Sequence, residues 1–148
     1  MADYAFRVIR HKDMTDESLI PWQATLELMD KVVRERSIKL KSIKLHYHPN
    51  GMRTDHAMGV TDFDKSQIVL CSNDFDTALH ELAHIWTGDA HTTKWARALY
   101  RLYDWYIPEQ AAELRKATSR EYRNARLKTK KENRAWKTSR LRTCSLGG

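Results

Sequence analysis

Cysteine is scarce in this chain of 148 residues, which holds only Cys71 and Cys144. Cys71 lies in a strand-like run and Cys144 lies close to the end of the sequence. The pair therefore supports neither a disulfide framework nor a zinc site built from cysteine thiolates.

Long apolar runs are missing as well. No apolar stretch approaches the roughly 18 residues of a membrane-spanning helix, and the N-terminal sequence MADYAFRVIRHKD lacks the apolar segment of a secretory signal. Internal repeats are not evident, and the length suits one compact domain of ordinary size. We therefore expect a soluble, cytoplasmic protein that makes no contact with a membrane.

What the sequence does contain is a short histidine motif, because residues 80–84 read HELAH. On an α-helix, His80 and His84 differ by only about 40° in direction and about 6 Å in height, so both imidazoles can bind one metal ion. Glu81 then lies beside the open side of that metal. Neutral imidazole suits Zn²⁺, and a carboxylate next to zinc can accept a proton from water. This is the HExxH signature of zincins, and it predicts a zinc site with a glutamate base.

The flanking residues predict a helix around this motif. Asn73 or Asp74 can cap its N-terminus, and Gly88 is a suitable stop. An apolar stripe would anchor the opposite side of the helix in a core; it comprises Ala78, Leu79, Leu82, Ile85 and Trp86.

A third zinc ligand is required, and His91 is the first candidate because it follows the predicted helix end at Gly88 by three residues. The metzincin pattern HExxHxxGxxH does not fit, since Thr87 and Ala90 stand where that pattern has glycine and histidine. Other candidates for the third ligand remain open, and they are Asp89, Asp104, His46, His48 and His56.

The stretch HTTKWARALYRLYDWYI, residues 91–107, resembles the segment that follows the motif in SprT-like metallopeptidases, with Trp95 at the aromatic position. Thr92 departs from the glycine usual there. The resemblance covers residues 18–107. It implies a zincin-like fold and a zinc peptidase whose metal is held by His80, His84 and His91. Some SprT-like proteases cut proteins that are crosslinked to DNA.

The order of predicted elements implies an α+β fold. We expect a helix over residues 19–36, strands over 43–48, 56–61 and 67–71, and a short edge strand over 4–9. The strands would form a small, largely antiparallel sheet, and the edge strand nearest the metal helix, 56–61 or 67–71, would hold an extended peptide. A supporting helix should start at Thr92 or Thr93 and end before Pro108.

Charge is distributed unevenly. Residues 1–108 hold 14 Lys and Arg against 15 Asp and Glu, whereas residues 109–148 hold 12 against 4. We therefore expect a zincin-like domain over 1–108 and a basic, helical or disordered extension over 109–148. The extension can contact nucleic acid without reading its sequence, or it can simply be a solvated surface. The candidate contacts are Arg115, Lys116, Arg120, Arg123, Arg126, Lys128, Lys130, Lys131 and Arg134.

These observations predict a zinc-dependent metallopeptidase with Glu81 as general base, acting on a protein or peptide. A second donor to the substrate carbonyl would come from Tyr100, Tyr103 or Tyr106. The alternative is a nucleic-acid-binding protein whose zinc site is structural or catalytically silent. Glu81 favours the enzyme, because a structural site needs no carboxylate beside an open position. A regulatory peptidase with a single protein target would share the same chemistry.

Overall fold

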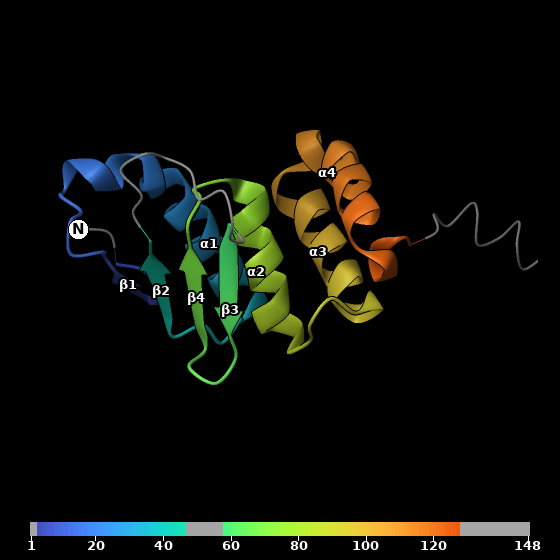
Figure 1. The fold of residues 1–148 in the computed structure, drawn as a ribbon, viewed down its shortest axis with the longest axis horizontal. Helices are drawn as coiled ribbons and strands as arrows, with labels where there is room; N and C mark the ends of the chain where they lie inside the picture. Colours follow the sequence, from blue (N-terminus) through green and yellow to red (C-terminus); the bar gives the residue numbers. More distant parts are fainter. Residues whose placement is uncertain (1–2, 47–57, 128–148) are drawn as a thin grey trace, which may run out of the picture.

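The computed structural model describes residues 3–46 and 58–127 (Figure 1). In chain order the elements are β1 (Arg7–Ile9), the 3-10 helix η1 (Glu17–Trp22), α1 (Gln23–Arg36), β2 (Ser42–Leu45), β3 (Gly59–Asp62), β4 (Gln67–Leu70), α2 (Phe75–Thr87), α3 (Thr93–Tyr106), α4 (Pro108–Glu121) and the 3-10 helix η2 (Arg123–Ala125). In these ranges, no helix has the combined length and apolar character needed to cross a membrane. The architecture is α+β, as the sequence predicts.

The first helical region is built in two parts. Pro21 lies inside η1, and the regular α-helix α1 starts only after Trp22. Its buried side includes Leu26, Met29 and Val33, which recur at helical spacing. The helix ends at Ser37, whose left-handed backbone (φ 53°) turns the chain toward β2.

The four strands form a mixed sheet in the order β1-β2-β4-β3. The pairs β1–β2 and β2–β4 are parallel, and only β3–β4 is antiparallel. The expectation of a largely antiparallel sheet is therefore wrong, because two of the three strand pairs are parallel. The connection from β1 to β2 runs through α1, and such a crossover places two strands parallel. β4 then inserts between β2 and β3, which leaves β3 at the edge.

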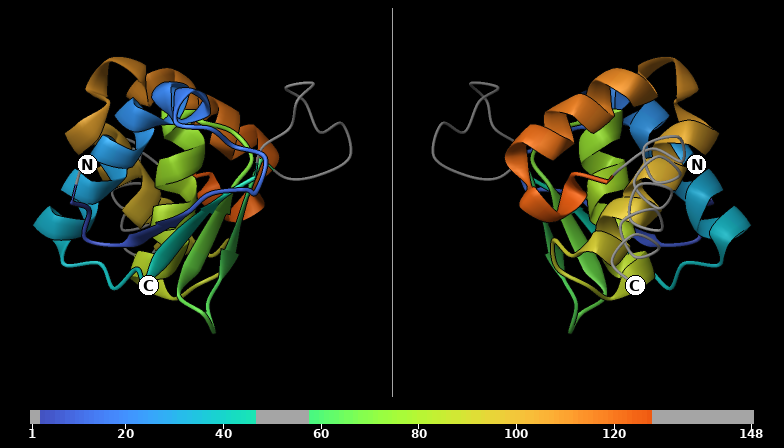
Figure 2. Two further views of the ribbon diagram at one scale, coloured as in Figure 1. Left: turned by 90° about the vertical axis from the view of Figure 1, so that its left-hand side faces the viewer. Right: turned by 90° about the vertical axis from the view of Figure 1, so that its right-hand side faces the viewer.

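Helices α1 and α2 lie on one face of this sheet (Figure 2). Ile43, Leu45, Ile68 and Leu70 alternate along β2 and β4 and are fully buried beneath the helices. Burial of these side chains fixes the position of α2 relative to the edge strand β3.

Helix α3 packs against α2, and α4 packs against the far side of α3. Thr92 caps α3 by accepting a hydrogen bond from the Trp95 backbone N–H, as predicted. Ala111, Thr118 and Ala125 are buried, and the Tyr100 hydroxyl donates to the carbonyl of Ala125. Residues 108–127, in which the basic extension begins, therefore form a packed layer of the fold.

Candidate metal centre

Helix α2 carries the first three residues of the site. It begins after Asp74 and ends at Gly88, whose left-handed backbone (φ 72°) confirms the predicted stop. The Gly88 N–H donates to the His84 carbonyl at 2.8 Å, so the chain turns sharply after the last helical turn. This reversal brings His91 back toward His80 and His84.

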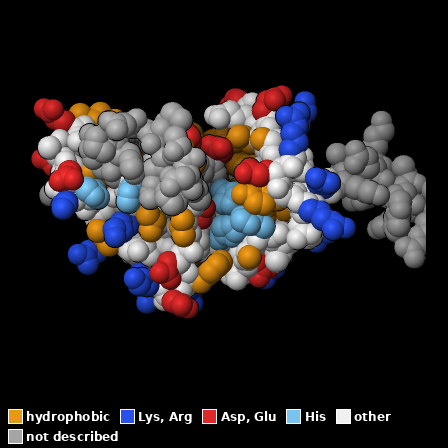
Figure 3. All heavy atoms as spheres, viewed as in Figure 1, with side chains coloured by type: hydrophobic (Ala, Val, Ile, Leu, Met, Phe, Trp, Pro, Cys, Tyr) orange, Lys and Arg blue, Asp and Glu red, His pale blue; other side chains and the backbone are white. Residues whose placement is uncertain are grey.

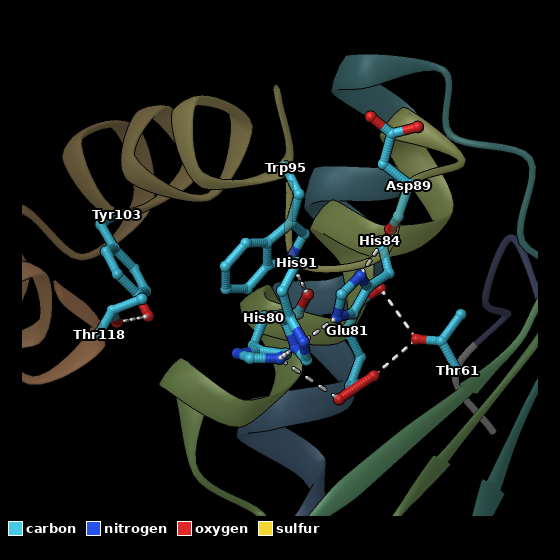
Figure 4. A network of polar contacts seen from close by, with 9 residues as sticks. All are labelled: Thr61, His80, Glu81, His84, Asp89, His91, Trp95, Tyr103 and Thr118. Atoms are coloured by element: carbon cyan, nitrogen blue, oxygen red, sulfur yellow. Dashed lines mark hydrogen bonds and ion pairs between the residues drawn. The ribbon is translucent and has the colours of Figure 1, made fainter. Parts of the chain in front are cut away.

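The three histidines converge through their ring nitrogens (Figure 4). His91 Nε2 lies 3.1 Å from His80 Nε2 and 3.2 Å from His84 Nε2, and one ligand atom of each residue lies within 4.8 Å of the others. Tetrahedral zinc with bonds of about 2.0–2.1 Å sets neighbouring nitrogens about 3.3 Å apart. The spacing and the all-nitrogen donor set therefore fit Zn²⁺.

Contacts around the cluster orient the rings. The Asp89 carbonyl lies 2.8 Å from His84 Nδ1, where it can accept that N–H and leave Nε2 free to bind a metal. The Trp95 indole stacks on His84 at 5.1 Å between centroids with an interplanar angle of 13°, and its Nε1–H donates to the His80 carbonyl. Trp95 is fully buried, so the packing of the core holds the indole ring that makes these contacts.

The surroundings favour neutral imidazoles. Burial, together with the neighbouring His84 and His91, lowers the pKa of His80 to about 3. Burial is also the largest cause that lowers the pKa values of His84 and His91. Neutral rings are the form that binds a metal, so the cluster needs little deprotonation to accept one.

Glu81 is buried beside the cluster, at 5% exposure. Its Oε2 accepts a hydrogen bond of 2.6 Å from the Thr61 hydroxyl of β3, and its Oε1 lies 3.9 Å from His80 Nε2 (Figure 4). Burial raises the pKa of Glu81 to about 7, while the Thr61 hydrogen bond lowers it. One carboxylate oxygen is thus anchored and the other is directed toward the histidines, with a proton affinity suited to a general base near neutral pH.

Of the rival third ligands, Asp104 is in an ion pair with Arg115, and the Asp89 carboxylate accepts from the Thr92 hydroxyl. Neither belongs to the three-histidine group, and nor does His46. His48 and His56 lie outside the described residues.

Two hollows of about 360 Å³ and about 260 Å³ flank the cluster. One lies between β3, α2, α3 and α4, and the other runs along β3. Gly59, His80, Glu81 and Tyr122 line both, so the hollows meet at the metal centre. Figure 3 shows the histidine side chains gathered at the surface near the middle of the view. On the β3 side, Val60 is 51% exposed.

The three tyrosines that we expected to supply a second donor to the substrate carbonyl have hydroxyls that already contact other residues of the protein. The hydroxyl of Tyr100 donates to Ala125, that of Tyr103 contacts the Thr118 hydroxyl, and that of Tyr106 donates to Glu35. Tyr103 still lines the larger hollow, but its hydroxyl is already engaged.

A fourth tyrosine, Tyr122, follows α4 and lies at the site, although the sequence gives no indication of this. Its ring stacks on His91 with centroids 4.1 Å apart and an interplanar angle of 29°. Asn124, two residues on, donates to the His91 carbonyl at 3.0 Å. Burial, followed by the charges of Glu121 and Glu81, raises the pKa of Tyr122, so its hydroxyl stays protonated. No motif surrounds this residue, and only the packing of α4 on α3 brings it to the site.

The candidate nucleic-acid contacts are spread over α4 and beyond. Lys116, Arg120, Arg123 and Arg126 are exposed, whereas Arg115 is half-buried beside Asp104 and the Tyr100 ring. Lys116 also lies 3.7 Å from Glu113. Lys128, Lys130, Lys131 and Arg134 lie outside the described residues.

Comparison with known proteins yields a structural likeness. No protein-family model matches the chain, and no curated protein sequence matches it. Two crystal structures, of Wss1 from Saccharomyces cerevisiae and of a Wss1 mutant, each match with a TM-score of 0.53 and 20% identity. Each match covers 71% of this chain, together with 92% of Wss1 and 94% of the mutant. Over most of its length, this chain therefore has the fold of Wss1.

Proposed function

We propose that this protein is a zinc-dependent peptidase. The proposal is carried by one observation: three imidazoles converge beside a buried, anchored carboxylate in a cleft next to an edge strand. His80, His84 and His91 would hold the ion. When bound, zinc supplies Lewis acidity, which acidifies a water and polarises a carbonyl group.

Glu81 is the general base in this proposal. Its Oε1 accepts a proton from the attacking water and then delivers it to the nitrogen of the leaving amine. The water oxygen forms a bond to the carbonyl carbon, and the C–N bond breaks. Thr61, which lies on β3, keeps the carboxylate in place because its hydroxyl donates a hydrogen bond to Oε2.

Strand β3 supports the choice of a peptide substrate. β3 is the edge of the four-stranded sheet, so its outer side has no strand partner among residues 3–46 and 58–127. An extended peptide can add to such an edge through backbone hydrogen bonds, independently of its sequence. The exposed Val60 and Phe63 side chains, 51% and 46% accessible, would contact substrate side chains.

We further propose that the substrates include proteins associated with nucleic acid. The resemblance to SprT-like peptidases, the shared fold with Wss1 and the basic extension support this choice. The alternative, a nucleic-acid-binding protein with a structural zinc site, fits the geometry less well. A structural site is usually closed by a fourth protein ligand, whereas the group in the described residues has three.

Replacement of the base tests the enzyme. With zinc present, the wild-type protein should cleave unfolded, fluorescently labelled casein, and Glu81→Gln should lower kcat by about 10²–10⁴-fold. The variant should keep its zinc, measured by mass spectrometry, because Glu81 is not one of the three nitrogen ligands. Glu113→Gln, an exposed site on α4, serves as the matched control and should cleave at the wild-type rate. A wild-type protein that cleaves no faster than Glu81→Gln, with or without DNA, contradicts the proposal.

A further inference from the structure

We propose that Tyr122 is a catalytic residue that donates a hydrogen bond to the substrate carbonyl oxygen as negative charge develops on it. This inference rests on the proposed peptidase activity and adds a role for a residue outside the histidine motif. Peptide hydrolysis passes through a tetrahedral species whose oxygen carries negative charge, and a fixed donor aimed at that oxygen lowers the barrier.

Tyr122 lies at the centre of the candidate site. Its ring stacks on His91 at 4.1 Å and lies 5.6 Å from the His80 ring, so it stands beside two of the three proposed zinc ligands. It also lines both hollows, together with Glu81. A peptide that runs from one hollow to the other must pass Tyr122 at the point where the proposed base and zinc ligands meet.

The hydroxyl of Tyr122 is available to a substrate. Among the described residues it has no hydrogen-bond partner, whereas the hydroxyls of Tyr100, Tyr103 and Tyr106 all have one. A donor already bound to a protein acceptor must break that bond before it can serve a substrate. Tyr122 therefore needs no such rearrangement.

The ring of Tyr122 is also held in place. His91 stacks against it, the Trp95 ring lies 5.3 Å away, and Asn124 ties the neighbouring backbone segment to the His91 carbonyl. A fixed donor costs little reorganisation during the reaction. In the step itself, Tyr122 keeps its proton and donates only a hydrogen bond. The proton of water passes through Glu81 to the leaving nitrogen, as described above.

Tyr122→Phe tests this role because it removes the hydroxyl and keeps the stacking ring. On unfolded casein, kcat should fall about 10²–10³-fold, as for loss of one donor to an oxyanion, with KM and zinc content unchanged. A phosphinic peptide, which mimics the tetrahedral species, should bind the variant more weakly by a similar factor in calorimetry. The affinity for the matching cleavable peptide, measured in the Glu81→Gln background, should stay the same.

Tyr106→Phe is the matched control, because it removes a tyrosine hydroxyl on α3 that is bonded to Glu35 and does not line either hollow. Its kcat should stay within about twofold of wild type. A Tyr122→Phe enzyme with wild-type kcat and wild-type affinity for the phosphinic peptide overturns the role of Tyr122 alone. Absence of turnover in the wild-type protein overturns the peptidase proposal, and this inference with it.

Discussion

Besides strand β3, which supplies Thr61, two helical segments of the chain contribute to the site, and the sequence marks only one of them. The segment from α2 to α3, residues 75–106, contributes Glu81 and the three histidines. The segment from α4 to η2, residues 108–125, is followed in sequence by the rest of the basic extension, and it contributes Tyr122 and Asn124. The first segment is recognised from spacing, and the second only from its packing.

The difference arises from the range of the interactions. His80 and His84 point the same way because they are four apart on a helix, which is a local property of the chain. Asn124 reaches His91 across 33 positions, and Tyr122 arrives beside it because α4 folds back along α3. A ligand set can therefore be encoded locally while the groups that hold it in place depend on tertiary structure.

Truncation tests this comparison with the largest expected effect. A chain ending at residue 107 would expose Tyr100 and Tyr103, which are now 9% and 2% exposed. Removal of packing equal to roughly two buried side chains costs at least about 3 kcal/mol of unfolding free energy, and lowers Tm by roughly 12 °C or more. Thermal unfolding followed by circular dichroism measures the change. We therefore propose that the folded domain continues past residue 108 and includes α4 and η2.

A chain ending at residue 127 is the control for this truncation. It keeps every interaction of α4 and η2 that the structure describes, so its Tm should be higher than that of the chain ending at 107, and it should retain zinc. If the chain ending at 107 unfolds with the same Tm and cooperativity as the chain ending at 127, then α4 does not stabilise the rest of the fold. That result would contradict the proposed role of the C-terminal segment.

The limits of prediction from the sequence follow the same division. The helix stop at Gly88 and the cap at Thr92 were predictable because each depends on a few neighbouring residues. The pairing of the strands was not, because β4 inserts between β2 and β3 through contacts that alternation of apolar residues does not encode. The position of His91 after Gly88 made it the first candidate for the third ligand. The course of the chain then shows that His91, and neither Asp89 nor Asp104, lies in one group with His80 and His84. Tyr122 lies in a polar, basic stretch that carries no signal of a site.

The positive charges of the C-terminal segment can be tested through DNA binding, where we expect an effect of intermediate size. Lys116, Arg120 and Arg123 are exposed on α4 and η2, and their replacement by glutamine should weaken binding to DNA. The slope of log affinity against log salt should become shallower by about 0.7–0.9 for each phosphate that the variant no longer neutralises. Fluorescence anisotropy with labelled DNA over a range of salt concentrations gives both quantities.

A matched triple variant on α3 separates location from charge. Lys94, Arg97 and Arg101 lie on α3 and their replacement by glutamine removes the same number of positive charges. We expect this variant to retain a salt dependence close to that of the wild type. Equal decreases in affinity in the two variants would mean that DNA responds only to net charge, and that α4 has no special part in binding.

The smallest expected effect concerns the hydrogen bond that joins the two segments. Asn124→Ala removes the donor to the His91 carbonyl, at a cost of about 0.5–1.5 kcal/mol in unfolding free energy. Because this hydrogen bond supports a proposed ligand, zinc affinity should fall by about tenfold, measured by competition with a chelator. Asn73→Ala is the control, since Asn73 is also exposed and donates to a backbone carbonyl, that of Pro21, away from the site. Both variants should be destabilised to a similar degree, but only Asn124→Ala should release zinc more readily. Equal zinc affinity in the two variants would show that α2 and α3 hold His91 without help from the C-terminal segment.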